Sequence, residues 1–204
     1  GYIFEKYINQ KQMGAYYTRT EITEYLCQTT IHRVILDGVN APAAAGLGGQ
    51  RYESIDDLLR RLDAPLCRRL LHDILPRLSI LDPACGSGAF LVAAMKTLLE
   101  VYGAVVGRIE FLRDRPLQAW VQDARRDHPS LHYFIRKKII TENLYGVDIM
   151  EEAVEICKLR LFLKLVAQVD SVGQIEPLPD IDFNIRAGNT LVGYASVFGA
   201  WYDV

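Results

Sequence analysis

The sequence predicts an α/β fold built on a parallel, doubly wound sheet, and three observations support this prediction. Apolar segments at residues 78–82 and 144–148 end at Asp82 and Asp148, and a third candidate strand, "DFNIRAGNT", ends near Gly188 and Asn189. Segments of helical composition separate these candidate strands. A loop with two glycines, residues 83–88, joins the first candidate strand directly to a helix. Strands that alternate with helices are typical of parallel sheets, whose ligands bind at the carboxyl ends of the strands.

The N-terminal part of the chain is expected to be helical. Thr18 and Glu21 have the spacing of a capping box. The residues that follow place one set of side chains roughly on one helical face: Ile22, Tyr25, Leu26, Thr29, Val34 and Ile35. We therefore predict an N-terminal helical arm over residues 1–37. Residues 38–78 are predicted to form a helical insertion, with a Gly-, Ala- and Pro-rich connection before a short helix that Ser54 caps.

Residues 79–204 are predicted to form the core of the fold. The first strand ends at Asp82, because the proline at position 83 does not continue a central strand. The helix after the glycine loop consists of good helix formers and is expected to end at Gly103. Residues 103–140 then form a charged helical insertion, whose basic residues we interpret as a solvated helix face.

Two more strands are expected in the second half of the chain. One ends at Asp148 and is followed by a helix that is apolar around most of its circumference, as is typical of a helix packed on a sheet. The other ends near Gly188 and Asn189. The order of elements therefore predicts that the loop glycines and two acids meet at one edge of the sheet.

Composition limits the classes of protein to be considered. The 204 residues carry a formal net charge of −2, which gives no electrostatic footprint for nucleic acid. Four scattered cysteines without metal-ligand spacing indicate reduced thiols and no zinc site. The sequence shows no uninterrupted apolar run of about 18 residues and no signal-peptide pattern. We expect a cytoplasmic domain that does not contact a membrane.

The chemistry of the predicted loop indicates its ligand. Gly86 and Gly88 permit close approach to the backbone, and the helix start behind them offers N–H groups to an anion. A carboxylate at Asp82 would repel a pyrophosphate but attract an ammonium group. Asp148 is placed to accept hydrogen bonds from ribose hydroxyls. A ligand that combines an amino acid, a ribose and a purine is S-adenosylmethionine.

Other readings of the loop fit the sequence less well. The dinucleotide fingerprint requires a third glycine, but Ala89, Phe90 and Leu91 follow Gly88, and Asp148 lies far downstream of the position of the ribose acid. No Gly-Lys-Ser/Thr follows, which excludes a P-loop. Cys85 lies near a helix N-terminus, where thiols become nucleophilic. No His and Asp partners are visible near it, so we interpret Cys85 as part of the loop surface.

Four segments of the sequence resemble a known family. "LDPACGSGAFL" resembles the first cofactor-binding motif of gamma-type adenine-N6 DNA methyltransferases of restriction-modification and phage-defence systems. "MGAYYTRTEI", "NLYGVDIMEEAVEICKLRL" and "DFNIRAGNTLVG" resemble the family's N-terminal, second and third motifs, in the same order. The resemblance implies a Rossmann-like SAM-dependent methyltransferase fold with an incomplete parallel sheet.

The resemblance also implies roles for individual residues. Tyr17 and Thr18 would contact the methionyl end of the cofactor, and Ile149 would pack on the adenine. Asn189 stands where many relatives have an acid, and its amide oxygen can accept from the exocyclic amine. Arg19 replaces the family's proline, so Thr18 would be held by the helix cap instead. The predicted cofactor-binding residues are Tyr17, Thr18, Asp82, Pro83, Ala84, Cys85, Gly86, Ser87, Gly88, Phe90, Asp148, Ile149, Asn189 and Thr190.

The family's catalytic motif, Asn-Pro-Pro-Tyr, does not occur in these 204 residues. Tyr202, Asp203 and Val204 are expected to open the fourth strand, which precedes that motif in the family. We therefore predict a piece of a larger enzyme that is inactive alone, with DNA contacts and any restriction or specificity domains mainly outside this chain. Two alternatives remain open: a non-catalytic module that binds cofactor or partners, and an acceptor other than adenine, such as cytosine N4 or RNA.

Overall fold

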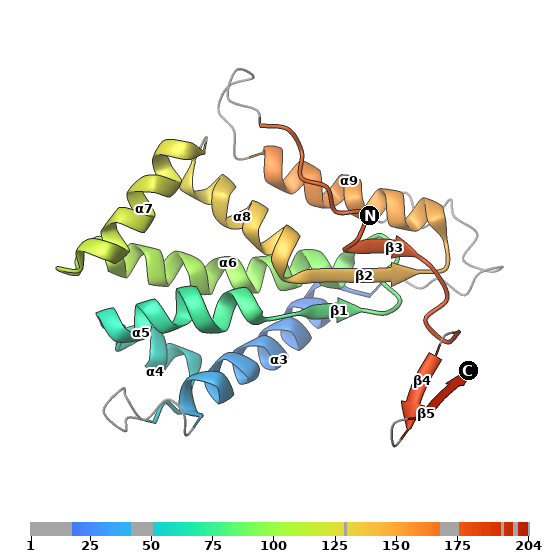
Figure 1. Cartoon of the computed structure of the whole chain (residues 1–204), viewed down its shortest axis with the longest axis horizontal. Coiled ribbons are helices and arrows are strands. Elements are labelled where there is room, and N and C mark those ends of the chain that lie inside the picture. The colour runs from blue at the N-terminus through green and yellow to red at the C-terminus, as the bar shows by residue number, and fades with distance from the viewer. Residues whose placement is uncertain are drawn as a thin grey trace.

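A three-stranded parallel sheet organises the chain (Figure 1). Its strands are β1 (Ile80–Asp82), β2 (Leu144–Asp148) and β3 (Ile185–Ala187), in the spatial order β1-β2-β3. Asp82 pairs with Gly146, and Asp148 pairs with Ala187, so all three strands end at the same edge. The computed structural model describes residues 18–41, 51–128, 130–167, 176–192, 194–197 and 200–203. The predicted α/β fold with parallel strands is confirmed.

The helices follow the predicted order along the chain. They are α3 (Thr20–Asn40), α4 (Ile55–Arg60), α5 (Ala64–Arg69), α6 (Ala89–Ile109), α7 (Arg115–Asp127), α8 (Leu131–Glu142) and α9 (Glu151–Val166). A π-helical turn (Leu70–Ile74) and a 3₁₀ turn (Leu75–Arg77) lead into β1. Ser54 caps α4 as predicted, because its hydroxyl accepts from the Asp57 N–H at 3.1 Å. Three further caps come from Asp63, Asp114 and Ser130.

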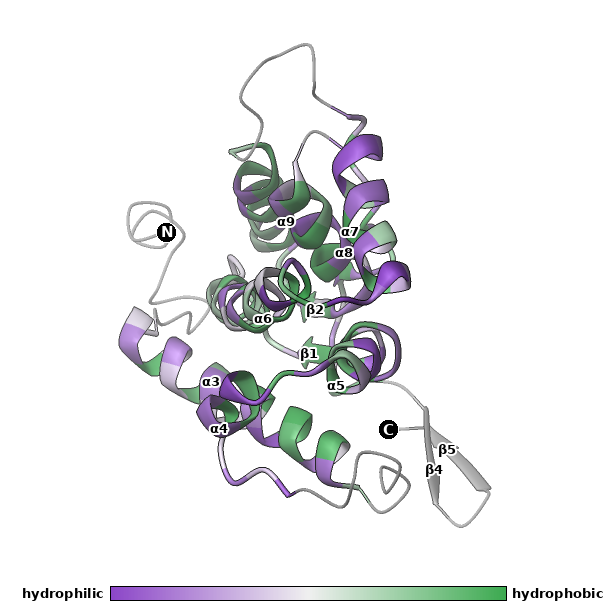
Figure 2. Ribbon diagram, turned by 90° about the vertical axis from the view of Figure 1, so that its left-hand side faces the viewer, coloured by the Kyte–Doolittle hydropathy of each residue, from purple (hydrophilic) through white to green (hydrophobic). Residues whose placement is uncertain are grey.

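Helix α6 is the centre of the packing. It contacts β1 and β2, while α9 contacts β2 and β3. Helices α3 and α4 lie on one side of α6, and α7, α8 and α9 lie on the other, in both views (Figures 1 and 2). Although α6 is long and apolar enough to cross a membrane, Leu91, Leu98 and Val105 are fully buried in the protein core. This burial is the pattern of a core helix.

Helix α3 differs from its prediction at its start and in its buried face. It begins at Thr20, and Arg19 is its N-cap without a side-chain hydrogen bond, so the predicted capping box of Thr18 and Glu21 is wrong. The predicted apolar face is wrong except at Ile35, because Tyr25 is 67 % exposed and Val34 is 52 % exposed, whereas Ile35 is fully buried. The buried stripe is Thr23, Cys27, Ile31, Ile35 and Val39. Its smaller side chains allow close contact with α6, where the Cys27 thiol donates to the Phe90 carbonyl at 3.5 Å.

Two further elements differ from their predictions. Helix α6 continues through Gly103 to Ile109, because its buried apolar stripe continues and packing outweighs the low helix propensity of glycine.

The C-terminal residues do not open a fourth parallel strand. Instead β5 (Ala200–Asp203) pairs antiparallel with β4 (Tyr194–Val197) in a separate two-stranded sheet. Pairing with the nearest segment of the chain costs little loop-closure entropy. Val204 lies outside the described residues.

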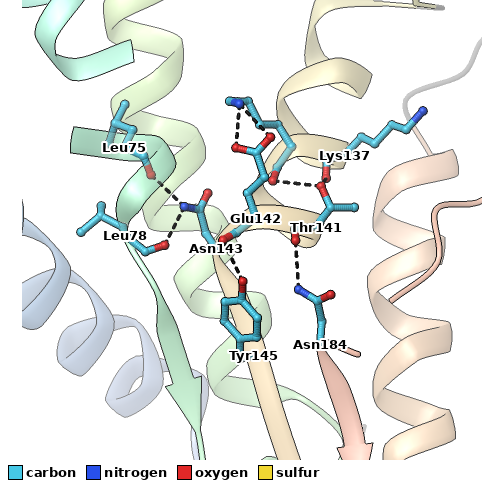
Figure 3. A network of polar contacts seen from close by, with 9 residues as sticks. Leu75, Leu78, Lys137, Thr141, Glu142, Asn143, Tyr145 and Asn184 are labelled. Atoms are coloured by element: carbon cyan, nitrogen blue, oxygen red, sulfur yellow. Dashed lines mark hydrogen bonds and ion pairs between the residues drawn. The ribbon is translucent and has the colours of Figure 1, made fainter. Parts of the chain in front are cut away.

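Two asparagines fix the alignment of the outer strands on β2 (Figure 3). The side chain of Asn143, which is fully buried, donates to the carbonyls of Leu75 and Leu78 at 2.7 and 2.8 Å. The Asn184 side chain donates to the carbonyls of Thr141 and Leu144 at 3.0 and 3.1 Å. These bonds hold the turns that precede β1 and β3 against the start of β2. The asparagines therefore help to set where each strand ends, and thus where the acids lie.

Candidate functional site

The glycine loop is attached to the end of β2. One Asp148 carboxylate oxygen accepts from the Gly86 N–H at 2.7 Å, and the other accepts from the Met150 N–H at 3.0 Å. The Cys85 N–H donates to the Val147 carbonyl at 2.9 Å. Asp148 thus binds the loop directly, which sequence reasoning had not predicted. A carboxylate has about four lone-pair sites, so Asp148 retains capacity to accept further hydrogen bonds.

Asp82 lies beside this loop with half of its carboxylate unsatisfied. Its Oδ1 accepts from the Ala84 N–H at 3.2 Å, whereas its Oδ2 is buried and has no hydrogen-bond partner within the described parts of the chain. Burial raises the pKa of Asp82, the Ala84 hydrogen bond opposes this, and the charge of Asp148 raises it further. A buried carboxylate oxygen without a donor is unfavourable. The site therefore favours a ligand that brings a cationic donor.

The two loop glycines have different surroundings. Both have positive φ, +50° at Gly86 and +81° at Gly88. A Cβ added at Gly86 would meet no atom within 4 Å, so this stretch of backbone faces open space. A Cβ at Gly88 would lie 2.5 Å from the Cys157 sulfur on α9. Gly86 thus leaves room beside Asp148, while Gly88 allows the loop to pack on α9.

An arginine that the sequence analysis missed supports the same loop. The Arg160 guanidinium, on α9, donates through one nitrogen to the Ser87 carbonyl at 2.7 Å and to the Ser87 hydroxyl at 2.9 Å. Arg160 and Ser87 are 73 positions apart, so no local pattern links them. The one signal available was a basic residue among the leucines of residues 159–165.

The segment after β3 also reaches the glycine loop. The Thr190 hydroxyl donates to the Pro83 carbonyl at 3.1 Å, which connects the ends of β1 and β3. The Asn189 side-chain oxygen accepts from the Leu191 N–H at 3.0 Å, so it stabilises a local turn. Ile149 is 67 % exposed at the same edge and presents an apolar surface. The structure thus brings these predicted residues together with Asp82 and the glycines.

The other predicted site residues take different positions. The Phe90 side chain packs against the hydrophobic core. Thr18 is half-buried before α3 and lines a separate hollow. Cys85 is buried, and both its hydrogen bond with Cys157 and its burial raise the pKa of its thiol, which disfavours a nucleophilic thiolate. Tyr17 lies outside the described residues.

Comparison with known proteins identifies the family. The family model of the MmeI DNA-methyltransferase domain matches residues 61–191, which include the glycine loop, both acids and Thr190. The chain belongs to this DNA-methyltransferase family. The predicted resemblance to methyltransferases of restriction-modification systems is thereby confirmed.

Two known proteins are similar in sequence to this chain. RM.MjaORFECS2P of Methanocaldococcus jannaschii is 35 % identical over 210 residues, which cover 95 % of this chain and 16 % of that protein. RM.Eco57I of Escherichia coli is 28 % identical over 114 residues, which cover 54 % of this chain and 11 % of that protein. The names of both describe a type II restriction enzyme and methyltransferase. The chain thus spans about a sixth or less of the length of either relative.

Proposed function

We propose that this chain binds S-adenosylmethionine as part of a DNA adenine-N6 methyltransferase. One observation carries the proposal: the unsatisfied Asp82 oxygen lies at the same edge of the sheet as Gly86 and Asp148. Membership of a DNA-methyltransferase family supports it independently.

The residues present fit the parts of this cofactor. Its methionyl ammonium would supply the cationic donor that the buried Asp82 oxygen lacks. Its ribose hydroxyls would donate to the remaining lone pairs of Asp148, and the open space at Gly86 would admit a group beside that carboxylate. Its adenine would pack on the exposed side chain of Ile149. When bound, the cofactor would supply an electrophilic methyl group on a sulfonium.

The role of these residues is to bind and orient. Catalysis by positioning requires that the acceptor nitrogen lie in line with the transferred methyl group. Enzymes that modify a base extrude it from the duplex, and the groups that receive the extruded adenine would come from other parts of the enzyme. The net charge of −2 agrees with DNA contacts that lie mainly outside these residues.

Calorimetric titration of the full chain with S-adenosylmethionine tests cofactor binding. We expect Asp148→Ala to weaken binding by about 1.5–3 kcal/mol, the value of hydrogen bonds to a charged group. Asp82→Asn should weaken binding at least about tenfold, because it removes the charge that faces the ammonium. Asp37→Asn is the matched control, since Asp37 forms an exposed ion pair with Arg33 on α3. No binding by the native chain, or equal affinities for all three variants, would contradict the proposal.

The choice of adenine is tested separately, in the enzyme that contains this chain. DNA treated with that enzyme and S-adenosylmethionine is digested to nucleosides and analysed by mass spectrometry. We expect N6-methyladenine. N4-methylcytosine as the product would refute the adenine assignment while leaving the proposed cofactor site intact.

A further inference from the structure

A hollow of about 310 Å³ lies between α3, α6, α8 and α9. Neither Asp82 nor Asp148 lines it. Its volume lies at the lower end of the range typical of small-ligand pockets, about 300–1,000 Å³. Its polar lining consists of Thr18, Thr20, Thr23, Glu24, Lys96, Arg136, Arg160 and Lys164.

The charges around this hollow do not balance. Its one acid, Glu24, is already paired with Lys96 at 2.8 Å. No carboxylate in the described ranges of the chain forms an ion pair with Arg136, Arg160 or Lys164. Within the part of the chain that the structure describes, three cationic side chains therefore line the hollow without a paired carboxylate.

Arg136 makes this imbalance costly. One of its terminal guanidinium nitrogens is buried and has no hydrogen-bond partner among the described residues. Burial lowers the pKa of Arg136. A desolvated cation that lacks both a counter-charge and an acceptor is unfavourable, and an anion that accepts from it would remove this cost.

We propose that Arg136, Arg160 and Lys164 form a binding site for a phosphate group. Guanidinium groups bind phosphate oxygens in a bidentate manner, and three cations match the charge of a phosphate or pyrophosphate better than that of a single carboxylate. The site differs from the pair of acids in the proposed cofactor site, because neither Asp82 nor Asp148 lines the hollow, although the predicted cofactor residue Thr18 does.

Arg160 would connect the two sites. A guanidinium group has five N–H donors, and the two bonds to Ser87 come from one nitrogen of Arg160. The other nitrogens remain able to donate to a phosphate in the hollow. A bound phosphate would therefore hold the arginine that supports the glycine loop.

Calorimetric titration of the full chain with pyrophosphate, against chloride at equal ionic strength, tests the proposal. We expect saturable binding that Arg136→Gln weakens at least about tenfold. Arg125→Gln is the matched control, because Arg125 lies outside the hollow and pairs with Glu110. If Arg136→Gln does not fold, Lys164→Gln replaces it, with an expected loss of about two- to fivefold because Lys164 is exposed.

Two competition experiments complete the test. A short DNA duplex that displaces pyrophosphate would identify the phosphate as that of a nucleic acid backbone, and failure to displace it would identify a small phosphate ligand; either result agrees with a phosphate site. Displacement of pyrophosphate by S-adenosylmethionine would overturn the proposal, because the hollow would then belong to the cofactor site. Absence of pyrophosphate binding, or equal binding by the native and Arg136→Gln chains, would also overturn it.

Discussion

Substitution of Gly88 by alanine should destabilise the protein through one identifiable contact. The added Cβ would lie 2.5 Å from the Cys157 sulfur and 3.4 Å from the Cys157 Cβ. Cys157 is fully buried on α9, so its sulfur is enclosed by the core and the clash cannot be relieved toward solvent. The residue must also hold φ at +81°, which side chains disfavour.

The two costs can be estimated separately. The left-handed backbone costs an L-residue about 1–2 kcal/mol. Forcing extra atoms into a packed core costs about 1–3 kcal/mol. The free energy of unfolding should therefore fall by roughly 2–5 kcal/mol for Gly88→Ala. Gly86→Ala meets only the backbone cost, about 1–2 kcal/mol, because its Cβ would meet no atom within 4 Å.

Urea denaturation followed by circular dichroism measures the free energy of unfolding of Gly88→Ala and Gly86→Ala. The same measurement is made on Cys157→Ala and on the double variant Gly88→Ala/Cys157→Ala. Since the second substitution removes the clashing sulfur, the double variant should be less destabilised than the sum of the single variants, by about 1–3 kcal/mol. Additive effects within about 0.5 kcal/mol, or equal losses for Gly86→Ala and Gly88→Ala, would refute this explanation of the glycine. Cofactor binding should rank Gly86→Ala and Gly88→Ala in the opposite order from stability. Gly86→Ala fills the open space beside Asp148, so it should bind the cofactor more weakly than Gly88→Ala.

Three further substitutions test other parts of the site and fold. Asp82→Asn should raise the free energy of unfolding at pH 7. The pKa of Asp82 is raised in the folded protein, so the folded state binds more protons than the unfolded state at pH values just above the ordinary Asp pKa of about 3.9. The stability of the native chain therefore falls as pH rises above that value, and asparagine removes this loss. In denaturation curves this advantage should vanish below that pH, and an advantage that is constant with pH would refute it. Asn143→Ala should cost roughly 1–3 kcal/mol in thermal unfolding, because the Leu78 carbonyl loses its side-chain donor and the Leu75 carbonyl keeps only the Leu78 N–H at 3.3 Å; a loss under about 0.5 kcal/mol would argue against the asparagine as a determinant of strand alignment. Arg160→Gln should lower the free energy of unfolding by about 1.5–3 kcal/mol through its bonds to Ser87, and an unchanged urea midpoint would show that these bonds contribute no stability.

The elements that the sequence predicted correctly have local signals. Asp82 followed by a proline marks the end of β1, and Ser54 is followed three residues later by the N–H that it caps. The wrong predictions concerned which residues of a helix are buried and where a helix ends. The apolar residues of α3 could equally form a stripe through Tyr25, and the glycine at 103 could equally end α6. In both cases the contact between α3 and α6 and the burial along α6 decided the outcome.

The sequence by itself determined the positions of the strands along the chain, the glycines of the loop and the acids at the strand ends, because each depends on residues within a few positions of one another. Only the tertiary structure decided that Asp148 binds the loop, that one oxygen of Asp82 is left without a donor, and that Arg160 reaches Ser87. These features depend on distances between segments 60 or more positions apart in the chain. Such distances follow from how helices pack on a sheet, and that packing is the sum of many weak contacts that no short motif contains.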